Sequence, residues 1–377
     1  MSQTYDIGIR GGGIVGCTLA LHLAAKRLRV ALHAPTLHRD EQGGDVRAYA
    51  LNQSSRQLLD AIRCWPGELA ATPVLRMQVH GDQGGAIQFD AAMQGVPALN
   101  WIVDVPALEA KLREAIGYQP LITLVDEPAP AELTVVCEGR ASQTRAELSV
   151  EFDTHPYQQY AVATRVRSVT PHQRIAHQWF QHSGNDSAIA GFLPMGGRDS
   201  GDWAVVWSVS ATQQQQLLAL SDDEFCQQLA AVTEGELGPF TLLAPRQTWM
   251  LQHACAQRWS GRAAWGSWVL AGDAAHNVHP LAGQGLNLGL GDATELIARI
   301  AHRDYWRAVS DPKVLRAYER ARKADFALVG GTGDALQRLF AHPHTAVQQL
   351  RNRGMSLMNA SGFAKHWLAQ QAMHTHG

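Results

Sequence analysis

The spacing of apolar residues predicts that strand and helix alternate in the first part of the chain. Short apolar runs at 5–9 and 29–32 are typical of strands, and the apolar run at 19–25 has the character of a helix. A strand, a helix and a second strand in this order predict a βαβ unit with two parallel strands. This character extends to about residue 59.

Strand-like alternation dominates the middle of the chain. Residues 74–89 alternate as a hairpin does, with glycine-containing residues 82–85 as the turn. Helical spacing at 104–116 and a short apolar strand at 133–137 come next. From 148 to about 207 the pattern again predicts strands, separated by glycine-rich breaks.

Helical spacing returns in the last part of the chain. Ser221 is expected to be the N-cap of a helix that runs to Val232, with Glu224 completing a capping box. After Asp292 the pattern predicts helices as far as the last residue.

The interleaving of these segments predicts an α/β protein with a discontinuous first domain. One lobe is assembled from three pieces, and a mixed β-sheet lobe is inserted between them. A ligand is expected in the crevice between the lobes, at the carboxyl ends of the strands. The predicted boundaries are 1–73, 98–147 and 262–340 for the first lobe, 74–97 and 148–261 for the second, and 341–377 for a C-terminal helical segment.

A glycine-rich segment follows the first predicted strand and opens the first predicted helix. Gly11, Gly13 and Gly16 have the spacing G-x-G-x-x-G. In this context the first glycine permits a tight turn, the second lets the backbone approach a pyrophosphate, and the third lets helix and strand pack closely. The alternative is a plain glycine-rich turn between a strand and a helix.

Residues 268–292 carry the most specific pattern. A short apolar run ends at Gly272 and Asp273, which predicts a carboxylate at a strand tip, where it can accept hydrogen bonds from sugar-like hydroxyls. A loop with Pro280 and two close glycines then leads to a helix start, where backbone N–H groups favour negative charge. A polyol chain and a ring that becomes anionic on reduction belong to a flavin. We therefore predict a flavin site, with an ordinary strand–loop–helix as the alternative.

Composition narrows the class of protein. The 377 residues are enough for two packed lobes, and a net charge of −2 indicates no nucleic-acid surface. The five scattered cysteines predict reduced thiols rather than a disulfide frame. The sequence begins directly with a predicted strand and contains no apolar run of about 18 residues, so a signal peptide and a membrane span are not expected. We therefore predict a cytoplasmic protein, with a peripheral position on the inner membrane face as the alternative.

Taken together, the motifs resemble the ubiquinone-biosynthesis hydroxylase family, a para-hydroxybenzoate-hydroxylase-like family of FAD-dependent monooxygenases. The resemblance rests on the glycine fingerprint, on residues 45–51, on the G-D-A-A-H…H-P-L-A-G-Q-G-L-N-L-G-L block at 272–290, and on residues 318–322 and 351–362. It implies a Rossmann-like FAD-binding domain with an inserted β-sheet substrate domain.

The resemblance also implies a reaction. It is aromatic hydroxylation by a flavin C4a-hydroperoxide, with O₂ and a lipophilic polyprenylated phenol or quinone precursor of ubiquinone as substrates. Because the chain has one dinucleotide fingerprint, NAD(P)H is expected to bind transiently in the same crevice as a reductant. Contact with the membrane surface or with a biosynthetic complex, and a homo-oligomer, are further alternatives.

The resemblance assigns roles to individual residues. Arg47 is expected near the cofactor, and Asp273 at its ribityl and pyrophosphate region, with no general base assigned. The residues expected along the pyrophosphate are Gly11, Gly13, Ile14, Val15 and Gly16. Those expected beside the flavin ring are Pro280, Gly283, Gln284, Gly285, Leu286 and Asn287.

Three positions depart from the family pattern. Ala34 stands where a carboxylate normally holds the adenosine ribose, so we expect weaker FAD binding than in relatives with glutamate there. Glu138 replaces the aspartate of the family's second fingerprint, and Arg10 ends the first strand where a small apolar residue is usual.

Other residues allow more than one interpretation. His276 and His279 have only Asp273 as a nearby carboxylate, so we predict no metal site. Trp203, Trp207 and Trp249 either line a substrate cavity or belong to the core of the sheet lobe. The apolar and basic tail at 347–368 either docks on its own domain or rests on a membrane surface.

Two further functions stay open beside the hydroxylase of a polyprenylated phenol. One is an FAD monooxygenase of a soluble aromatic compound. The other is a non-catalytic scaffold member of the family with weakened FAD binding. The departures at Ala34 and Glu138 are the reason to consider it.

Overall fold

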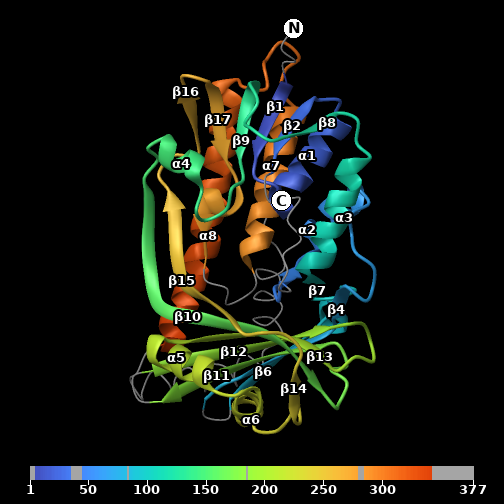
Figure 1. Cartoon of the computed structure of the whole chain (residues 1–377), viewed down its shortest axis with the longest axis vertical. Coiled ribbons are helices and arrows are strands. Elements are labelled where there is room, and N and C mark those ends of the chain that lie inside the picture. Colours follow the sequence, from blue (N-terminus) through green and yellow to red (C-terminus); the bar gives the residue numbers. More distant parts are fainter. Residues whose placement is uncertain (1–4, 35–44, 83–84, 184–185, 279–283, 342–377) are drawn as a thin grey trace.

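The computed structural model describes residues 5–34, 45–82, 85–183, 186–278 and 284–341, and their strands form three sheets. A six-stranded sheet and a nine-stranded sheet occupy opposite ends of the elongated molecule (Figure 1). Each of the two large sheets takes its strands from several separate segments of the chain, so the chain passes between the two ends more than once.

The six-stranded sheet carries the βαβ unit at the start of the chain. Its neighbouring strands are parallel except for one antiparallel pair at the edge. In spatial order they are β16 (Ser260–Ala263), β17 (Gly266–Leu270), β9 (Ala131–Val136), β1 (Tyr5–Arg10), β2 (Val30–His33) and β8 (Ile122–Val125). Strand β1 lies between β2, which follows it, and β9, which comes much later. Strand order thus reverses beside β1, which is where ligands bind in open α/β sheets.

Helices cover this sheet and complete its core. Residues Ile7, Leu19, Leu133 and Leu296 belong to one continuous buried cluster of strands and helices. The helices of this half are α1 (Ile14–Ala25), α2 (Gln53–Ala61), α3 (Val105–Gly117), α4 (Gln143–Glu147), α7 (Gln284–Ala301) and α8 (Pro312–Ala341). Helix α3 begins where Asp104 Oδ1 accepts a hydrogen bond from the Ala107 N–H at 3.3 Å.

The nine-stranded sheet forms the other end of the molecule. Its path is β18 (His276–Asn277), β15 (Gln247–Ala256), β10 (Phe152–Ser168), β13 (Asp202–Ser210), β12 (Asp186–Met195), β11 (Ile175–Ser183), β5 (Arg76–His80) and β6 (Ala86–Asp90), with β14 (Phe240–Leu242) paired to β10. Helices α5 (Ala211–Ala219) and α6 (Asp222–Val232) lie against it. Phe192, Trp203 and Phe225 are the largest completely buried side chains of the core there.

A small antiparallel sheet connects the two ends. It consists of β3 (Ala48–Leu51), β7 (Asn100–Asp104) and β4 (Ala71–Val74), and the chain also forms short 3-10 turns at Ala92–Gln94 and Gly272–Ala274. Arg165 of β10 donates to Asp104 Oδ2 at 2.8 Å and to the Asp45 carbonyl at 3.2 Å. The residues around 45–47 are therefore tied to the nine-stranded sheet.

The predicted fold class is confirmed: the protein is α/β, with a Rossmann-like unit and a second, mixed β-sheet. The hairpin of β5 and β6 and the Ser221–Glu224 capping box are present as expected. The expectation that all residues after Asp292 lie in helices was wrong at 302–311, where the chain turns between α7 and α8 before Pro312 opens the next helix. The C-terminal segment 342–377 lies outside the described residues.

Candidate functional site

Three loops meet at the carboxyl ends of the parallel strands. They follow β1 at Gly11, β9 at Cys137 and β17 at Ala271. Backbone hydrogen bonds hold the strand ends together: Cys137 N–H donates to the Arg10 carbonyl at 2.7 Å, and Ala271 N–H donates to the Val136 carbonyl at 3.0 Å. The segments far apart in sequence thus converge where the strand order reverses.

The glycine fingerprint fits a bound pyrophosphate. A Cβ on Gly11 would lie 2.3 Å from the Cys137 carbonyl oxygen, and one on Gly16 would lie 2.0 Å from the Gly11 carbonyl oxygen. Both glycines are therefore required by the chain itself. A Cβ on Gly13 meets nothing within 4 Å, so the protein alone gives no reason for glycine there. A ligand close to the backbone at the start of α1 would give that reason.

Substitutions at these two glycines should separate folding from binding. Gly16→Ala is expected to lower the free energy of unfolding by about 1–3 kcal/mol, because its Cβ overlaps backbone that cannot move away. Gly13→Ala should leave stability nearly unchanged and weaken FAD binding. Urea unfolding and FAD titration of both variants test this, and equal FAD affinity of Gly13→Ala and wild type would contradict the role of Gly13.

Asp273 lies at the tip of the loop after β17, inside the short 3-10 turn. Its side chain is 46% exposed, and its Oδ2 lies 3.9 Å from Arg140 Nε. The carboxylate occupies a recess: burial raises its pKa, while His276, Arg140 and Arg47 act in the opposite direction. A carboxylate that is open to a ligand but surrounded by protein is suited to bind ligand hydroxyls.

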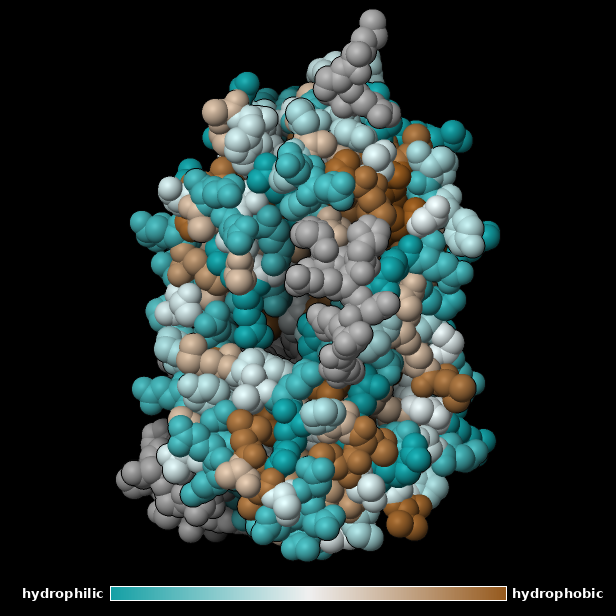
Figure 2. Space-filling view, viewed as in Figure 1, coloured by the Kyte–Doolittle hydropathy of each residue, from teal (hydrophilic) through white to brown (hydrophobic). Residues whose placement is uncertain are grey.

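Arg47 and Tyr49 bring further polar groups to the same recess. Arg47 forms a two-point ion pair with Asp45. The charges of Arg47, Asp273 and Arg140 all act on the pKa of the Tyr49 hydroxyl. Burial raises the pKa of the Tyr49 hydroxyl, so it stays protonated at neutral pH. Sequence reasoning assigned no role to Tyr49, although strand alternation puts residues 47 and 49 on one face. Figure 2 shows a hollow in this face of the molecule, between the ends that hold the two large sheets.

A buried ionic network fixes the loop that carries Asp273. Asp292 of α7 is completely buried and accepts hydrogen bonds at 2.7 Å from Gly272 N–H, His276 Nε2 and Arg322 Nε. Arg322, on α8, also donates to the Leu288 carbonyl at 3.1 Å. The expectation that His276 has only Asp273 as a carboxylate neighbour was wrong, because α7 folds back and places Asp292 against it.

A second buried cation supports the same turn from the other side. Arg145 of α4 donates to the Ala274 carbonyl at 2.9 Å and to the Arg140 carbonyl at 2.7 Å, and its guanidinium stacks on Phe152 at 3.7 Å. Arg145 thus links the loop after β9 to the turn after β17.

The residues predicted to lie beside the flavin ring are found at and just before the start of α7, and some of them are not among the described residues. Pro280 and Gly283 lie outside the described residues, and α7 begins at Gln284. Asn287 uses its side chain inside the protein: Oδ1 accepts from Asn52 N–H at 3.0 Å and from Ser55 Oγ at 2.8 Å, and Nδ2 donates to the Ala50 carbonyl at 2.8 Å. The predicted contact of Asn287 with a flavin would therefore have to come from its backbone.

The neighbouring predicted residues differ in their surroundings. Gly285 has open space where a Cβ would be, whereas Leu286 packs on the main core. Ile14 is buried in that core. Val15 packs between two glycines, since a Cβ on Gly289 would lie 2.8 Å from Val15 Cγ2 and one on Gly272 would lie 3.4 Å from it. Ile14 and Val15 can therefore reach a pyrophosphate only with their backbone N–H groups.

The departures from the family pattern have local explanations. The Glu138 carboxylate accepts hydrogen bonds from Ser142 Oγ, Thr144 N–H and Thr144 Oγ1 at 2.7–2.9 Å, so it caps the start of α4. Arg10 donates to Thr144 Oγ1 at 3.1 Å and stacks on Trp265 at 4.8 Å. Ala34, just past β2, is buried and offers no polar group.

The tryptophans and cysteines are mostly structural. Trp203 and Trp207 belong to the core beneath α6, so the cavity interpretation was wrong for them, while Trp249 is half-buried on β15. All five cysteines have free thiols, as the prediction of reduced cysteines requires.

Comparison with known proteins identifies the family. Residues 125–328, more than half of the chain, match the family model described as FAD binding domain. The chain therefore belongs to this FAD-binding family, and FAD is its cofactor. In sequence it is similar to ubiquinone hydroxylase UbiL of Rhodospirillum rubrum, with 28% identity over 99% of this chain and 90% of the relative. It is equally similar, at 28% identity over 99% of both chains, to 3-demethoxyubiquinol 3-hydroxylase of Escherichia coli.

Solved structures agree on the fold. p-Nitrophenol 4-monooxygenase PnpA from Pseudomonas putida superposes with a TM-score of 0.75 at 19% identity, covering 98% of both chains. PqsL of P. aeruginosa superposes with a TM-score of 0.73, covering 94% of this chain and 99% of its own. These two structures confirm the predicted fold. The family model confirms an FAD-binding family, and with the sequence relatives it supports the predicted enzyme class, an FAD-dependent monooxygenase.

None of the helices in the described part of the chain combines the length and the apolar character needed to span a membrane.

Proposed function

We propose that this chain hydroxylates a polyprenylated phenol or quinone precursor in ubiquinone biosynthesis. The observation that carries the proposal is similarity over essentially the whole chain to two proteins named as ubiquinone-pathway hydroxylases. The three converging loops support it, because their glycines, carboxylate and cations suit the parts of FAD.

In this proposal each loop binds one part of the cofactor. The Gly11–Gly16 loop and the start of α1 hold the pyrophosphate with backbone N–H groups. Asp273 accepts hydrogen bonds from the ribityl chain, and the positive charge of Arg140, 3.9 Å away, favours the ionised carboxylate against the effect of burial. Gly285 at the first turn of α7 lets the backbone approach the ring edge, where the helix N-terminus favours negative charge. FAD supplies the activation of O₂ when it is bound.

Arg47 and Tyr49 are proposed to face the cofactor and the substrate from the small sheet. Arg47 is held by Asp45, and its charge keeps anionic groups in the recess. The protonated Tyr49 hydroxyl can donate a hydrogen bond to a phenolate or carbonyl oxygen. Both side chains also fill the recess and help to exclude water. NAD(P)H is proposed to reduce the flavin by binding transiently in the same place.

The test is a hydroxylation assay with FAD-loaded protein. With NAD(P)H and O₂, a prenylated phenol should yield a product one oxygen atom heavier by mass spectrometry, and it should accelerate NAD(P)H oxidation. A matched phenol without the prenyl chain is the control, and its preferred hydroxylation would favour a soluble aromatic substrate instead. No product from any prenylated phenol would overturn the proposal.

A scaffold role in a biosynthetic assembly, beside catalysis, is the second candidate function. Two observations favour it: Ala34 offers no group to the adenosine ribose, and the Glu138 carboxylate is engaged inside the protein. Such a protein would contact other members of a biosynthetic complex, or the inner membrane face where a lipophilic precursor resides. Co-flotation with lipid vesicles, together with the assay above, separates the two candidates.

Restoring a carboxylate at Ala34 is expected to tighten FAD binding. Charge-assisted hydrogen bonds to the ribose contribute roughly 1.5–3 kcal/mol, or about 10- to 100-fold in dissociation constant. Titration of wild type and Ala34→Glu by fluorescence quenching measures this difference, with Ala34→Gln as the neutral control of similar size. Equal affinities would show that another group has taken over the ribose contact.

A further inference from the structure

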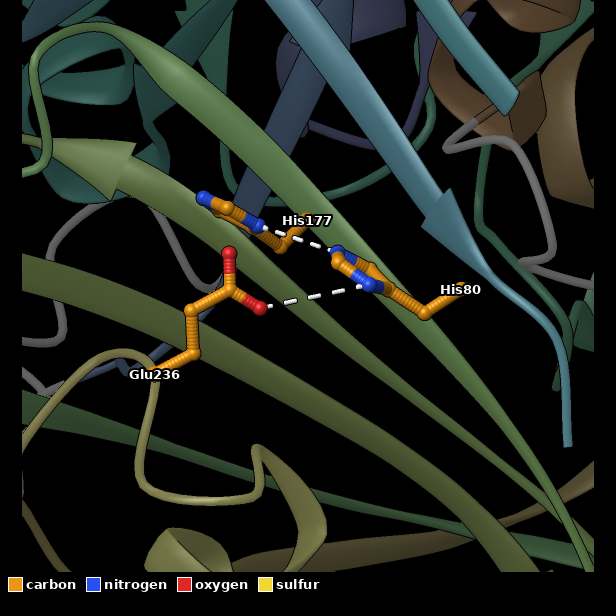
Figure 3. Close-up of side chains that lie close together, drawn as sticks. All are labelled: His80, His177 and Glu236. Atoms are coloured by element: carbon orange, nitrogen blue, oxygen red, sulfur yellow. Dashed lines mark hydrogen bonds and ion pairs between the residues drawn. The ribbon is translucent and has the colours of Figure 1, made fainter. Parts of the chain in front are cut away.

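A cluster of three metal-binding side chains lies at the end of the molecule that is remote from the glycine loops. His80 of β5, His177 of β11 and Glu236, in the turn after α6, point toward one another (Figure 3). One ligand atom from each side chain lies within 4.8 Å of the others. This cluster was not predicted from the sequence, because its members come from three distant segments.

The spacing of the two imidazole nitrogens is close to that required by a tetrahedral ion. His177 Nδ1 and His80 Nε2 lie 3.5 Å apart. Two imidazole nitrogens on a tetrahedral Zn²⁺, each at about 2.0–2.1 Å, are separated by about 3.3–3.4 Å, whereas neighbouring positions of an octahedral ion are separated by about 2.9 Å. In this arrangement His80 Nε2 and His177 Nδ1 are the imidazole ligands. The Glu236 carboxylate lies 4.0 Å from the other ring nitrogen of His80, Nδ1, and is half-exposed, so a rotation of its side chain toward Nε2 brings an oxygen to the ion.

We propose that His80, His177 and Glu236 bind a divalent transition metal of the zinc type, with water as the fourth ligand. Two imidazoles and one carboxylate are a common donor set for such an ion. The site is separate from the proposed flavin site and does not depend on the hydroxylase function.

Both histidines are prepared to act as ligands at neutral pH, because a metal binds the neutral imidazole. Burial, with His80 and Arg76 nearby, lowers the pKa of His177 to about 3. Burial also lowers the pKa of His80, against the opposing charges of Glu236 and Glu234. The two glutamates favour a dication here, while the Arg76 charge opposes it.

The ring of Trp179 fixes the orientation of both imidazoles. It stacks on His80 with centroids 4.5 Å apart and on His177 with centroids 5.2 Å apart, at interplanar angles of 10° and 8°. Rigid surroundings of this kind reduce the entropy cost of assembling a metal site.

Its place in the fold gives the site a structural role. Among the described residues, strand β5 pairs with β11, in parallel, and with its hairpin partner β6. A metal would link β5 and β11 to the turn after α6, which carries Glu236. The ion would therefore connect the β5–β6 hairpin, at the edge of the sheet, to the turn after α6. Metal binding should accordingly stabilise the folded chain.

The experiment measures Zn²⁺ binding by the full chain after treatment with a chelator. Equilibrium dialysis is expected to give one tight equivalent, and Co²⁺ as a substitute should give the intense visible bands of a four-coordinate ion. His80→Gln and Glu236→Gln should each weaken binding by at least about 10- to 100-fold, the range seen even for outer partners of metal ligands. The Zn²⁺-dependent rise in Tm should disappear in both variants.

The matched control is His155→Gln, which removes a member of the His155–His253 pair on the same sheet, where the rings are 6.4 Å apart. This variant should bind Zn²⁺ as wild type does. The proposal is overturned if wild type takes up no tight equivalent, if Glu236→Gln and His80→Gln bind normally, or if His155→Gln loses the ion. Because Glu236 is half-exposed, its variant decides the question even where a histidine variant fails to fold.

Discussion

Replacing Asp292 by alanine is expected to lower the free energy of unfolding by about 3–5 kcal/mol, the cost of leaving a buried charge without its partner. Asp292 is completely buried and accepts three hydrogen bonds, from Gly272, His276 and Arg322. Its removal leaves the guanidinium of Arg322, 2% exposed, with Asp325, which is itself partly exposed, as its remaining ion-pair partner among the described residues.

Urea unfolding of wild type and variant measures this effect. The matched control is Asp304→Ala, which also breaks an aspartate–arginine pair at 2.8 Å, but on the surface, where such pairs contribute roughly 0–1 kcal/mol. A loss below about 1 kcal/mol for Asp292→Ala would contradict the assignment of the network as the anchor of this loop.

The same network predicts a dependence of stability on pH. Burial acts to raise the pKa of the Asp292 carboxyl, but the charges and hydrogen bonds of His276 and Arg322 outweigh it and hold the pKa below its usual value. A depressed folded-state pKa stabilises the protein at pH values above the unfolded pKa of about 3.9. That contribution should be lost as the pH falls through the folded-state value, and it should be absent from Asp292→Asn.

Asp273→Ala should abolish flavin retention and leave the protein folded. Loss of charge-assisted hydrogen bonds to the ribityl region weakens binding by roughly 1.5–3 kcal/mol, or about 10- to 100-fold. Stability should change little, because the side chain is 46% exposed and its ion pair with Arg140 is long, at 3.9 Å. FAD content after dialysis, fluorescence titration and the unfolding midpoint are the measurements.

Here too Asp304→Ala is the control, since it removes a carboxylate of similar exposure from the turn between α7 and α8. Full flavin occupancy of Asp273→Ala after dialysis would contradict the role of this residue. A large drop in its unfolding midpoint would instead show that Asp273 serves the fold.

Patterns local in sequence predicted a good part of the structure. The G-x-G-x-x-G spacing between a strand and a helix predicted the turn at Gly11 and the close packing at Gly16, because steric limits on a Cβ act within a few residues. The capping box at Ser221 and Glu224 was predictable for the same reason, since both hydrogen bonds lie within one helical turn.

Tertiary structure decided everything that depends on contacts between distant segments. Asp292 meets His276 and Arg322 only because α7 and α8 pack against the loop after β17. Tyr49 comes within electrostatic range of Arg140 and Asp273 only because β3 packs on α7, which also contacts the turn that carries Asp273. His80, His177 and Glu236 converge through strand pairing and helix packing across the opposite sheet. Spacing along a sequence records the geometry of one element, whereas burial, pairing of charges and ligand sets arise where several elements meet.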